Sequence, residues 1–164
     1  MVMRLGFRLK HHFFSAFREF FVHHHGSLEF RAKIFALIIA ANEKAKVESF
    51  ITVKDLGLHI YDGDTDRANL LMLSTKELVQ KVRENNGLDV DTLVQHIQKE
   101  LKIVPRYAKK IDIKAIRPLL ALTYDEDTLS YQENILEFLG KLKDETLNTK
   151  RDQINESEKL AKKN

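Results

Sequence analysis

The sequence predicts an all-α protein, a compact multi-helix bundle, and three observations lead to this class. The chain has 164 residues, of which 43% are hydrophobic, enough for one soluble domain with a buried core. It holds only six Gly and two Pro, so the residues that usually mark turns between strands are scarce. Apolar residues recur at three- and four-residue intervals in successive segments, which is the spacing of helix faces. The absence of Cys excludes disulfides, thiolate nucleophiles and cysteine-ligated metal sites.

Residues 1–25 form a basic and aromatic segment that differs from the rest of the chain. They carry four Arg or Lys and one acidic residue, whereas residues 26–164 carry 23 basic and 23 acidic residues. Because the body has no net basic character, nucleic acid is not expected as a partner. The longest apolar run of the segment is too short to span a bilayer, which takes about 20 residues, and no signal-peptide cleavage site follows it. Its neighbouring histidines would point about 100° apart on a helix, so they are expected to be solvated or to cap a helix rather than to bind a metal.

The phenylalanines of this segment fall on one side of a predicted helix: Phe13, Phe14, Phe17, Phe20 and Phe21. Two interpretations stay open. In the first, this face enters the headgroup layer of a membrane while Arg4, Arg8 and Lys10 meet anionic lipid. In the second, the aromatic side chains pack against the body or are the remnant of an anchor.

The body begins with two predicted helices. Ser27 is a candidate N-cap for a helix over residues 28–41, which is apolar on nearly every side and is therefore expected at the centre of the bundle. A polar turn over residues 42–46 separates it from a second helix over residues 47–60.

An acidic turn over residues 62–66 follows the second helix. It resembles the start of a calcium loop, but an EF-hand needs Gly and Glu at the positions that Arg67 and Leu73 occupy. Asp64 or Asp66 is therefore expected to cap the next helix, which an Asn-Asn-Gly sequence ends.

The next predicted helix lies between two clear signals. Asp89 or Asp91 starts it, and Pro105 closes it. Residues 106–111 contain the basic cluster of the body and are expected to form a solvated connection.

The remaining part of the chain is predicted to hold a short helix and then a long one. Asp112 caps the short helix, and Pro118 is expected in the first turn of a restarted segment, because a mid-helix proline costs about 3 kcal/mol. Ser130 and Glu133 match the S-x-x-E capping box, which places the start of the last helix there. Beyond Lys143 charge dominates, so a fraying helix or a disordered tail is expected. The chain therefore divides into a membrane-associated or packing helix, a helical domain and a charged tail, with the boundaries 1–25, 26–147 and 148–164.

Two segments of the body resemble each other. Residues 36–47 read ALIIAANEKAKV and residues 118–129 read PLLALTYDEDTL, each a buried helix end, an acidic turn and an apolar residue that opens the next helix. The repeat, offset by 82 residues, suggests two related helical hairpins. In this pattern the chain resembles the TerB-like family (tellurite-resistance B type) of helical domains, which also forms the N-terminal part of DjlA-type membrane co-chaperones. The resemblance covers residues 28–145.

The resemblance implies a set of ligand residues at the two turns. Family hairpins carry an Ala-Asp-Gly-like turn and a Glu early in the next helix, and they are associated with calcium or another divalent metal and with protein complexes at the inner face of the membrane. The matching positions here are Asn42, Glu43, Glu48, Asp125, Asp127 and Glu133. Three or more of their oxygens would hold a divalent ion if the turns lie side by side, although Asn42 and Glu43 replace the usual Asp-Gly. The alternative is that these residues cap helices and hold no ion.

These observations lead to an expected function without catalysis. The resemblance implies a cytoplasmic protein-interaction module linked to co-chaperone or stress and tellurite-resistance complexes, held peripherally at the inner membrane by residues 1–25. The alternative is a soluble helical adaptor or export co-chaperone that shields amphipathic segments of a partner protein between its helices. No J-domain is expected, because neither Pro105 nor Pro118 belongs to a His-Pro-Asp triplet. A metal-dependent hydrolase is disfavoured because the turns lack a catalytic His and a nucleophile.

Overall fold

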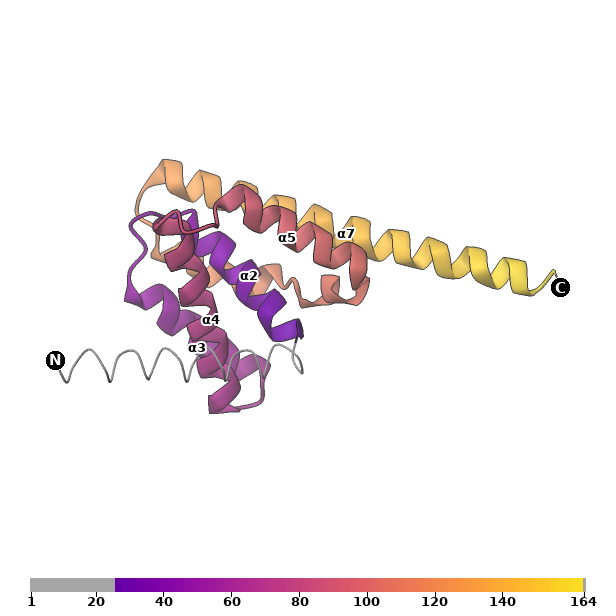
Figure 1. Cartoon of the computed structure of the whole chain (residues 1–164), viewed down its shortest axis with the longest axis horizontal. Helices are drawn as coiled ribbons and strands as arrows, with labels where there is room; N and C mark the ends of the chain where they lie inside the picture. Colours follow the sequence, from indigo (N-terminus) through magenta and orange to yellow (C-terminus); the bar gives the residue numbers. More distant parts are fainter. Residues whose placement is uncertain (1–25, 164) are drawn as a thin grey trace.

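The computed structural model describes residues 26–163, and these residues fold into helices and connecting turns without a strand. Figure 1 shows a body of packed helices from which the last helix projects. The all-α class predicted from the sequence is confirmed for this part of the chain. The elements are α2 (Gly26–Ala40), α3 (Val47–Ile60), α4 (Thr65–Arg83), α5 (Val90–Ile103), the 3₁₀ helix η1 (Pro105–Lys110), α6 (Ile113–Ile116), the 3₁₀ helix η2 (Arg117–Leu122) and α7 (Glu126–Ala161).

Helix α2 lies at the centre of the body, as its apolar sequence predicts. It contacts α4, α5, α7 and both 3₁₀ helices, so other elements cover it on several sides. Phe30, Leu37 and Ile38 are completely buried. A helix without a polar face has no favourable position at the surface, so its sequence fixes its place in the core.

Helices α3 and α4 form a tightly packed antiparallel hairpin. Gly57 on α3 lies so close to α4 that a Cβ atom at this position would stand 3.0 Å from the Cα atom of Ala68. The turn between the helices contains Asp62 and Gly63, both with positive φ, and it ends at the cap residue Asp64. The small residue at the crossing allows the two backbones to approach.

Aspartates begin most of the helices that follow α3. Asp64, Asp89 and Asp112 accept hydrogen bonds from the backbone amides of the residues three positions further on, at 3.0, 2.7 and 3.1 Å. Each bond satisfies an amide that has no partner inside the helix. Pro118 stands in the first turn of η2. These positions agree with the sequence prediction.

Two predicted helix starts are wrong. Gly26 is already helical, so Ser27 lies within α2 and is not its N-cap. Helix α7 begins at Glu126 rather than at the capping box of Ser130 and Glu133, because Asp125 caps it. The Asp125 carboxylate accepts bonds from both the amide and the hydroxyl of Thr128, so the helix starts one turn earlier than predicted.

The segment expected to be a solvated connection is the 3₁₀ helix η1, which packs against α7 and α5. Ala108 and Ile111 are fully buried, three residues apart, which is the spacing of one 3₁₀ turn. The Lys143 ammonium on α7 donates a 2.7 Å bond to the Ile111 carbonyl oxygen and joins the two elements. The basic side chains of residues 106–111 therefore belong to a helix that packs against the body, not to a loose connection.

Helix α7 is continuous over 36 residues, so the charged C-terminal part is neither frayed nor disordered. Figure 1 shows its second half running past the body as a single helix. The side chains of residues 151–163 are all exposed. Within residues 26–163, no helix is both long enough and apolar enough to cross a membrane.

Candidate functional site

The two similar segments meet in space at their turns. The Asn42 side-chain amide, at the turn after α2, donates a 3.3 Å hydrogen bond to the hydroxyl of Thr123, at the turn after η2. Asn42 is buried, and its other side-chain atom accepts a 3.0 Å bond from the backbone amide of Lys44. The repeat in the sequence therefore corresponds to two turns that lie side by side.

A buried glutamine extends this contact into the core. Gln132 on α7 is 2% exposed, accepts a 2.7 Å bond from the Thr123 hydroxyl and donates a 3.0 Å bond to the Ile38 carbonyl oxygen. That carbonyl is open to a side chain because the amide of Asn42 bonds to Ile39 instead of continuing the α-helical pattern. Asn42, Thr123 and Gln132 thus form one polar network between α2, η2 and α7. Gln132 was not predicted as a network residue, since nothing in the sequence around it distinguishes it from an exposed helix residue.

A cleft of about 500 Å³ opens beside the network. Polar residues of both turns line it, and they carry charges of both signs: Lys44, Lys46, Glu48 and Asp125. Hydrogen bonds from the side chain and the backbone amide of Thr128 lower the pKa of Asp125 below its ordinary value, and Lys44 adds a smaller effect in the same direction. The cleft is suited to polar contacts with a ligand or partner that carries both donors and acceptors.

The six residues implied as metal ligands are divided by the structure. Asn42, Glu48 and Asp125 line the cleft. Glu133 instead pairs with the guanidinium of Arg117 at 3.1 Å, and the remaining two, Glu43 and Asp127, are exposed. Across residues 26–163 no three His or acidic side chains come close enough to hold a metal ion together. The two turns are neighbours, and three of the six predicted ligand residues line one cleft, whereas the other three do not.

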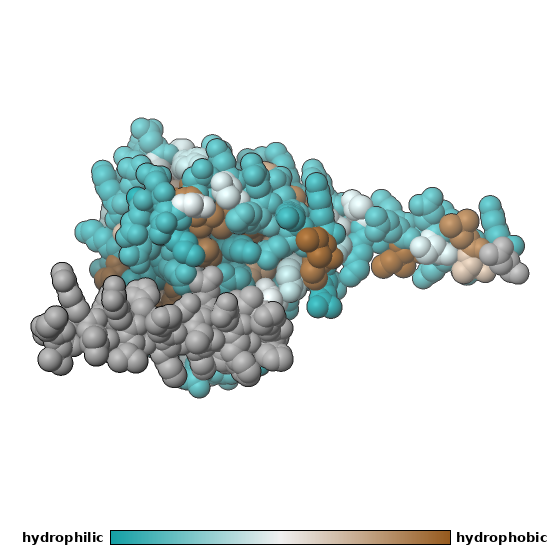
Figure 2. Space-filling view, viewed as in Figure 1, coloured by the Kyte–Doolittle hydropathy of each residue, from teal (hydrophilic) through white to brown (hydrophobic). Residues whose placement is uncertain are grey.

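A second hollow lies along the projecting half of α7. It is shallow and open to solvent, and it lies between Pro105, at the start of η1, and one face of α7 that includes Lys150, Ile154 and Glu158. Ile154, which lines this hollow, is 48% exposed. Leu160 lies outside the hollow and is 62% exposed. Figure 2 shows isolated apolar patches on this otherwise hydrophilic part of the molecule. We call this surface the α7 groove.

The predicted membrane-surface residues Arg4, Arg8, Lys10, Phe13, Phe14, Phe17, Phe20 and Phe21 lie outside the described residues, as do the histidines before Gly26. No model of a known protein family matches the chain, and neither curated proteins nor solved structures include one that is significantly similar to it.

Proposed function

We propose that this protein is a non-catalytic, TerB-like interaction module that binds an amphipathic helical segment of a partner protein in the α7 groove. The observation that carries the proposal is the projecting half of α7, which leaves the body as a single helix with exposed apolar side chains. This part of the helix buries little of its surface in the fold. Ile154 and Ala161 are the apolar α7 residues that line the groove, whereas Leu160 points to another side of the helix. An exposed helix face with apolar side chains is a common docking element for a second helix.

The groove favours a helix over an extended peptide. Its α7 wall is formed by residues at helical spacing, among them Lys150, Ile154, Ser157 and Ala161, which share one face. Small and apolar side chains at the middle of this face let a partner backbone come near, and Lys150 and Glu158 flank them. A partner helix with an apolar stripe and balanced charge fits this pattern.

Site-specific photo-crosslinking tests the proposal. A photoreactive residue replaces Ile154, in the groove, or Asn155, which is exposed but does not line the groove. In the native cell, position 154 is expected to crosslink to a defined protein, and position 155 much less. The crosslinked peptide, identified by mass spectrometry, is expected to be amphipathic and helical.

Binding of that peptide to the purified chain then measures the contribution of the groove. Ile154→Glu is expected to weaken binding at least tenfold, because it replaces about 1.5–3 kcal/mol of apolar burial with a charge. Asn155→Glu introduces the same charge on the other side and is expected to change the affinity less than about twofold. Equal crosslinking at the two positions, or equal weakening by the two variants, would contradict a role for the groove.

A further inference from the structure

A small basic pocket lies on the body, away from the α7 groove. Residues of α2, α6 and the ends of α3 and η1 line it. Its volume is about 80 Å³, enough to hold several water molecules. The side chains at its base, among them Ile34, Phe35 and Ile116, are apolar and buried. We call it the Arg31 pocket.

The pocket carries excess positive charge. Arg31, Lys109 and Lys110 line it together with a single carboxylate, Asp112, which leaves a net charge of +2. One Asp112 oxygen already accepts the 3.1 Å capping bond from the Ala115 amide. Within residues 26–163 none of the three cations forms an ion pair. The positive charge is therefore not neutralised by the part of the protein that the structure describes.

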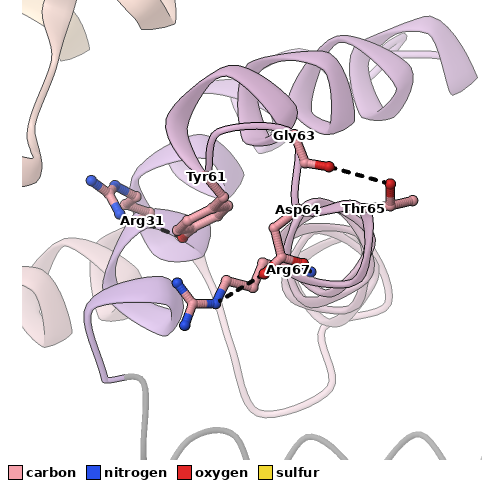
Figure 3. Close-up of polar contacts among 6 residues, drawn as sticks. All are labelled: Arg31, Tyr61, Gly63, Asp64, Thr65 and Arg67. Atoms are coloured by element: carbon pink, nitrogen blue, oxygen red, sulfur yellow. Dashed lines mark hydrogen bonds and ion pairs between the residues drawn. The ribbon is translucent and has the colours of Figure 1, made fainter.

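Arg31 is held in place by an aromatic side chain, as Figure 3 shows. Its guanidinium donates a 3.4 Å hydrogen bond to the Tyr61 hydroxyl, and its central carbon lies 5.4 Å from the centre of the ring. Burial raises the pKa of Tyr61, so the phenol stays neutral and supplies no counter-charge. The nearby Asp64 pairs with Arg67 at 3.4 Å instead. Arg31 is thus oriented by Tyr61 while its charge stays available.

The cations of the pocket repel one another. Burial lowers the pKa of Lys110, and the positive charges of Arg31 and Arg106 lower it further. An anion placed among these groups would relieve the repulsion. The apolar base strengthens such an attraction, because it lowers the local dielectric constant.

We propose that the Arg31 pocket binds a phosphate-class oxyanion, either the free ion or the phosphoryl group of a small phosphomonoester. A dianion matches the net charge of the lining residues, and a carboxylate would neutralise half of it. The planar fork of Arg31 and the ammonium groups of Lys109 and Lys110 supply the donors that phosphoryl oxygens accept. The pocket is small, which suits a single oxyanion group at its base.

Titration of the full chain with inorganic phosphate tests the proposal. At about pH 8 and low salt, where phosphate is largely a dianion, calorimetry is expected to show one site per chain. Amide resonances of Lys110, Asp112 and Ala115 are expected to shift along the same saturation curve. Acetate and chloride at equal ionic strength are expected to bind at least tenfold more weakly, since they carry one charge. Absence of saturable binding, or acetate binding as tight as phosphate, would overturn the proposal.

Two lysines provide a matched pair of variants. Lys110→Gln, within the pocket, is expected to weaken phosphate binding at least tenfold, because it removes a charged hydrogen-bond donor. Lys114→Gln removes the same charge from an exposed position on α6 outside the pocket, and it is expected to change affinity less than about twofold. Equal losses in the two variants would mean diffuse attraction and would overturn the site.

A second pair of measurements covers folding and the source of the ligand. Arg31→Gln is expected to weaken phosphate binding at least tenfold, as Lys110→Gln does. Circular dichroism shows whether the Arg31→Gln variant is folded. If that variant does not fold, the phosphate affinity of Lys110→Gln alone tests the site. O-phosphoserine binding in the same pocket would assign it to phosphomonoesters, and binding of inorganic phosphate alone would assign it to the free ion. Neither result depends on the partner proposed for the α7 groove.

Discussion

At the scale of single residues, Gln132 is the side chain whose role is hardest to replace. Its amide satisfies the Thr123 hydroxyl and the Ile38 carbonyl, and the glutamine itself is only 2% exposed. Gln132→Leu keeps a similar volume but leaves both groups without this partner. We expect it to lower the free energy of unfolding by about 1–3 kcal/mol, the cost of a buried unsatisfied polar group.

Urea denaturation followed by circular dichroism measures this change. Asn134→Leu serves as the control, because Asn134 lies on the same helix but is exposed. It is expected to change stability by less than about 0.5 kcal/mol. If Gln132→Leu is as stable as the original chain, the network between α2, η2 and α7 does not contribute to stability.

The start of α7 leads to a prediction about acid. The pKa of Asp125 is lowered in the folded chain, mainly by the Thr128 hydroxyl, so the carboxylate stabilises the fold above its ordinary pKa of 3.8 and loses this effect as pH falls through the lowered value. Asp125→Asn keeps an acceptor at the cap but cannot titrate. We expect its melting temperature to fall less steeply with decreasing pH in the acid range than that of the original chain.

Thermal unfolding followed by circular dichroism at a series of acid pH values makes the comparison. Ser130→Ala is the control, since Ser130 lies inside the helix. Alanine favours a helix interior, so Ser130→Ala is expected to leave stability unchanged or to raise it by up to about 0.5 kcal/mol. A marked loss of stability in Ser130→Ala would place the helix start at Ser130.

The helix caps and Gln132 differ in how far their roles can be predicted from the sequence. Asp112 was predicted as a cap, and Asp64 and Asp89 were each predicted as one of two candidate aspartates, because a cap depends on a few neighbouring residues. At α7 two local signals compete, the S-x-x-E pattern and an aspartate followed by two acidic residues, and local rules do not rank them. Gln132 could not be predicted, because its role depends on a carbonyl 94 residues away.

At the scale of elements, two helix glycines give opposite expectations. Gly140 on α7 has no atom within 4 Å of the position of a Cβ, whereas a Cβ on Gly57 would stand 3.0 Å from the Ala68 backbone. Gly140→Ala is therefore expected to raise the free energy of unfolding by about 0.5–1 kcal/mol by favouring the helix. Gly57→Ala is expected to lower it by about 1–3 kcal/mol, because α3 and α4 must separate.

Chemical denaturation of the two variants under the same conditions tests the pair, and each variant is the control for the other. The substitution is identical, so helix propensity cancels and the difference reports the packing of the hairpin. Equal changes in the two variants would mean that α3 and α4 do not approach closely at Gly57.

Helices α2 to α5 were predictable from apolar spacing, and the caps of α4 and α5 from their aspartates, but η1 and the end of α7 were not predictable. The burial of Ala108 and Ile111 depends on α7, which lies far ahead in the sequence. The C-terminal part of α7 has little apolar periodicity, and its charge suggested a tail. Residues 143–164 contain five Lys and three Glu, which favour helix, and the segment continues from a packed helix, so it needs no new nucleation.

At the scale of the whole molecule, the candidate sites also depend on contacts between distant parts of the chain, which the local sequence does not determine. The repeat suggested two related hairpins, and the adjacency of their turns was only a condition for ion binding; the structure places the two turns side by side, as the bond between Asn42 and Thr123 shows. The Arg31 pocket gave no signal in the sequence, since Arg31, Ile60 and Lys110 belong to three separate elements. A site assembled from isolated residues becomes visible only when the fold brings them together.

Charge is divided unevenly over the whole chain, and this leads to a prediction about membranes. Residues 26–164 are balanced, so the net charge of +3 belongs to residues 1–25. If that segment meets anionic lipid, replacing Arg4, Arg8 and Lys10 by Ala is expected to weaken binding to vesicles containing phosphatidylglycerol about a hundredfold, at about 1 kcal/mol for each basic residue. Replacing Lys159, Lys162 and Lys163 by Ala removes the same charge from the other end and is expected to have little effect, because an apolar face accompanies only the first group.

Flotation of the full chain with anionic and with zwitterionic vesicles measures both variants. Failure of the full chain to float, or equal losses in the two triple variants, would favour the interpretation in which the phenylalanines pack against protein.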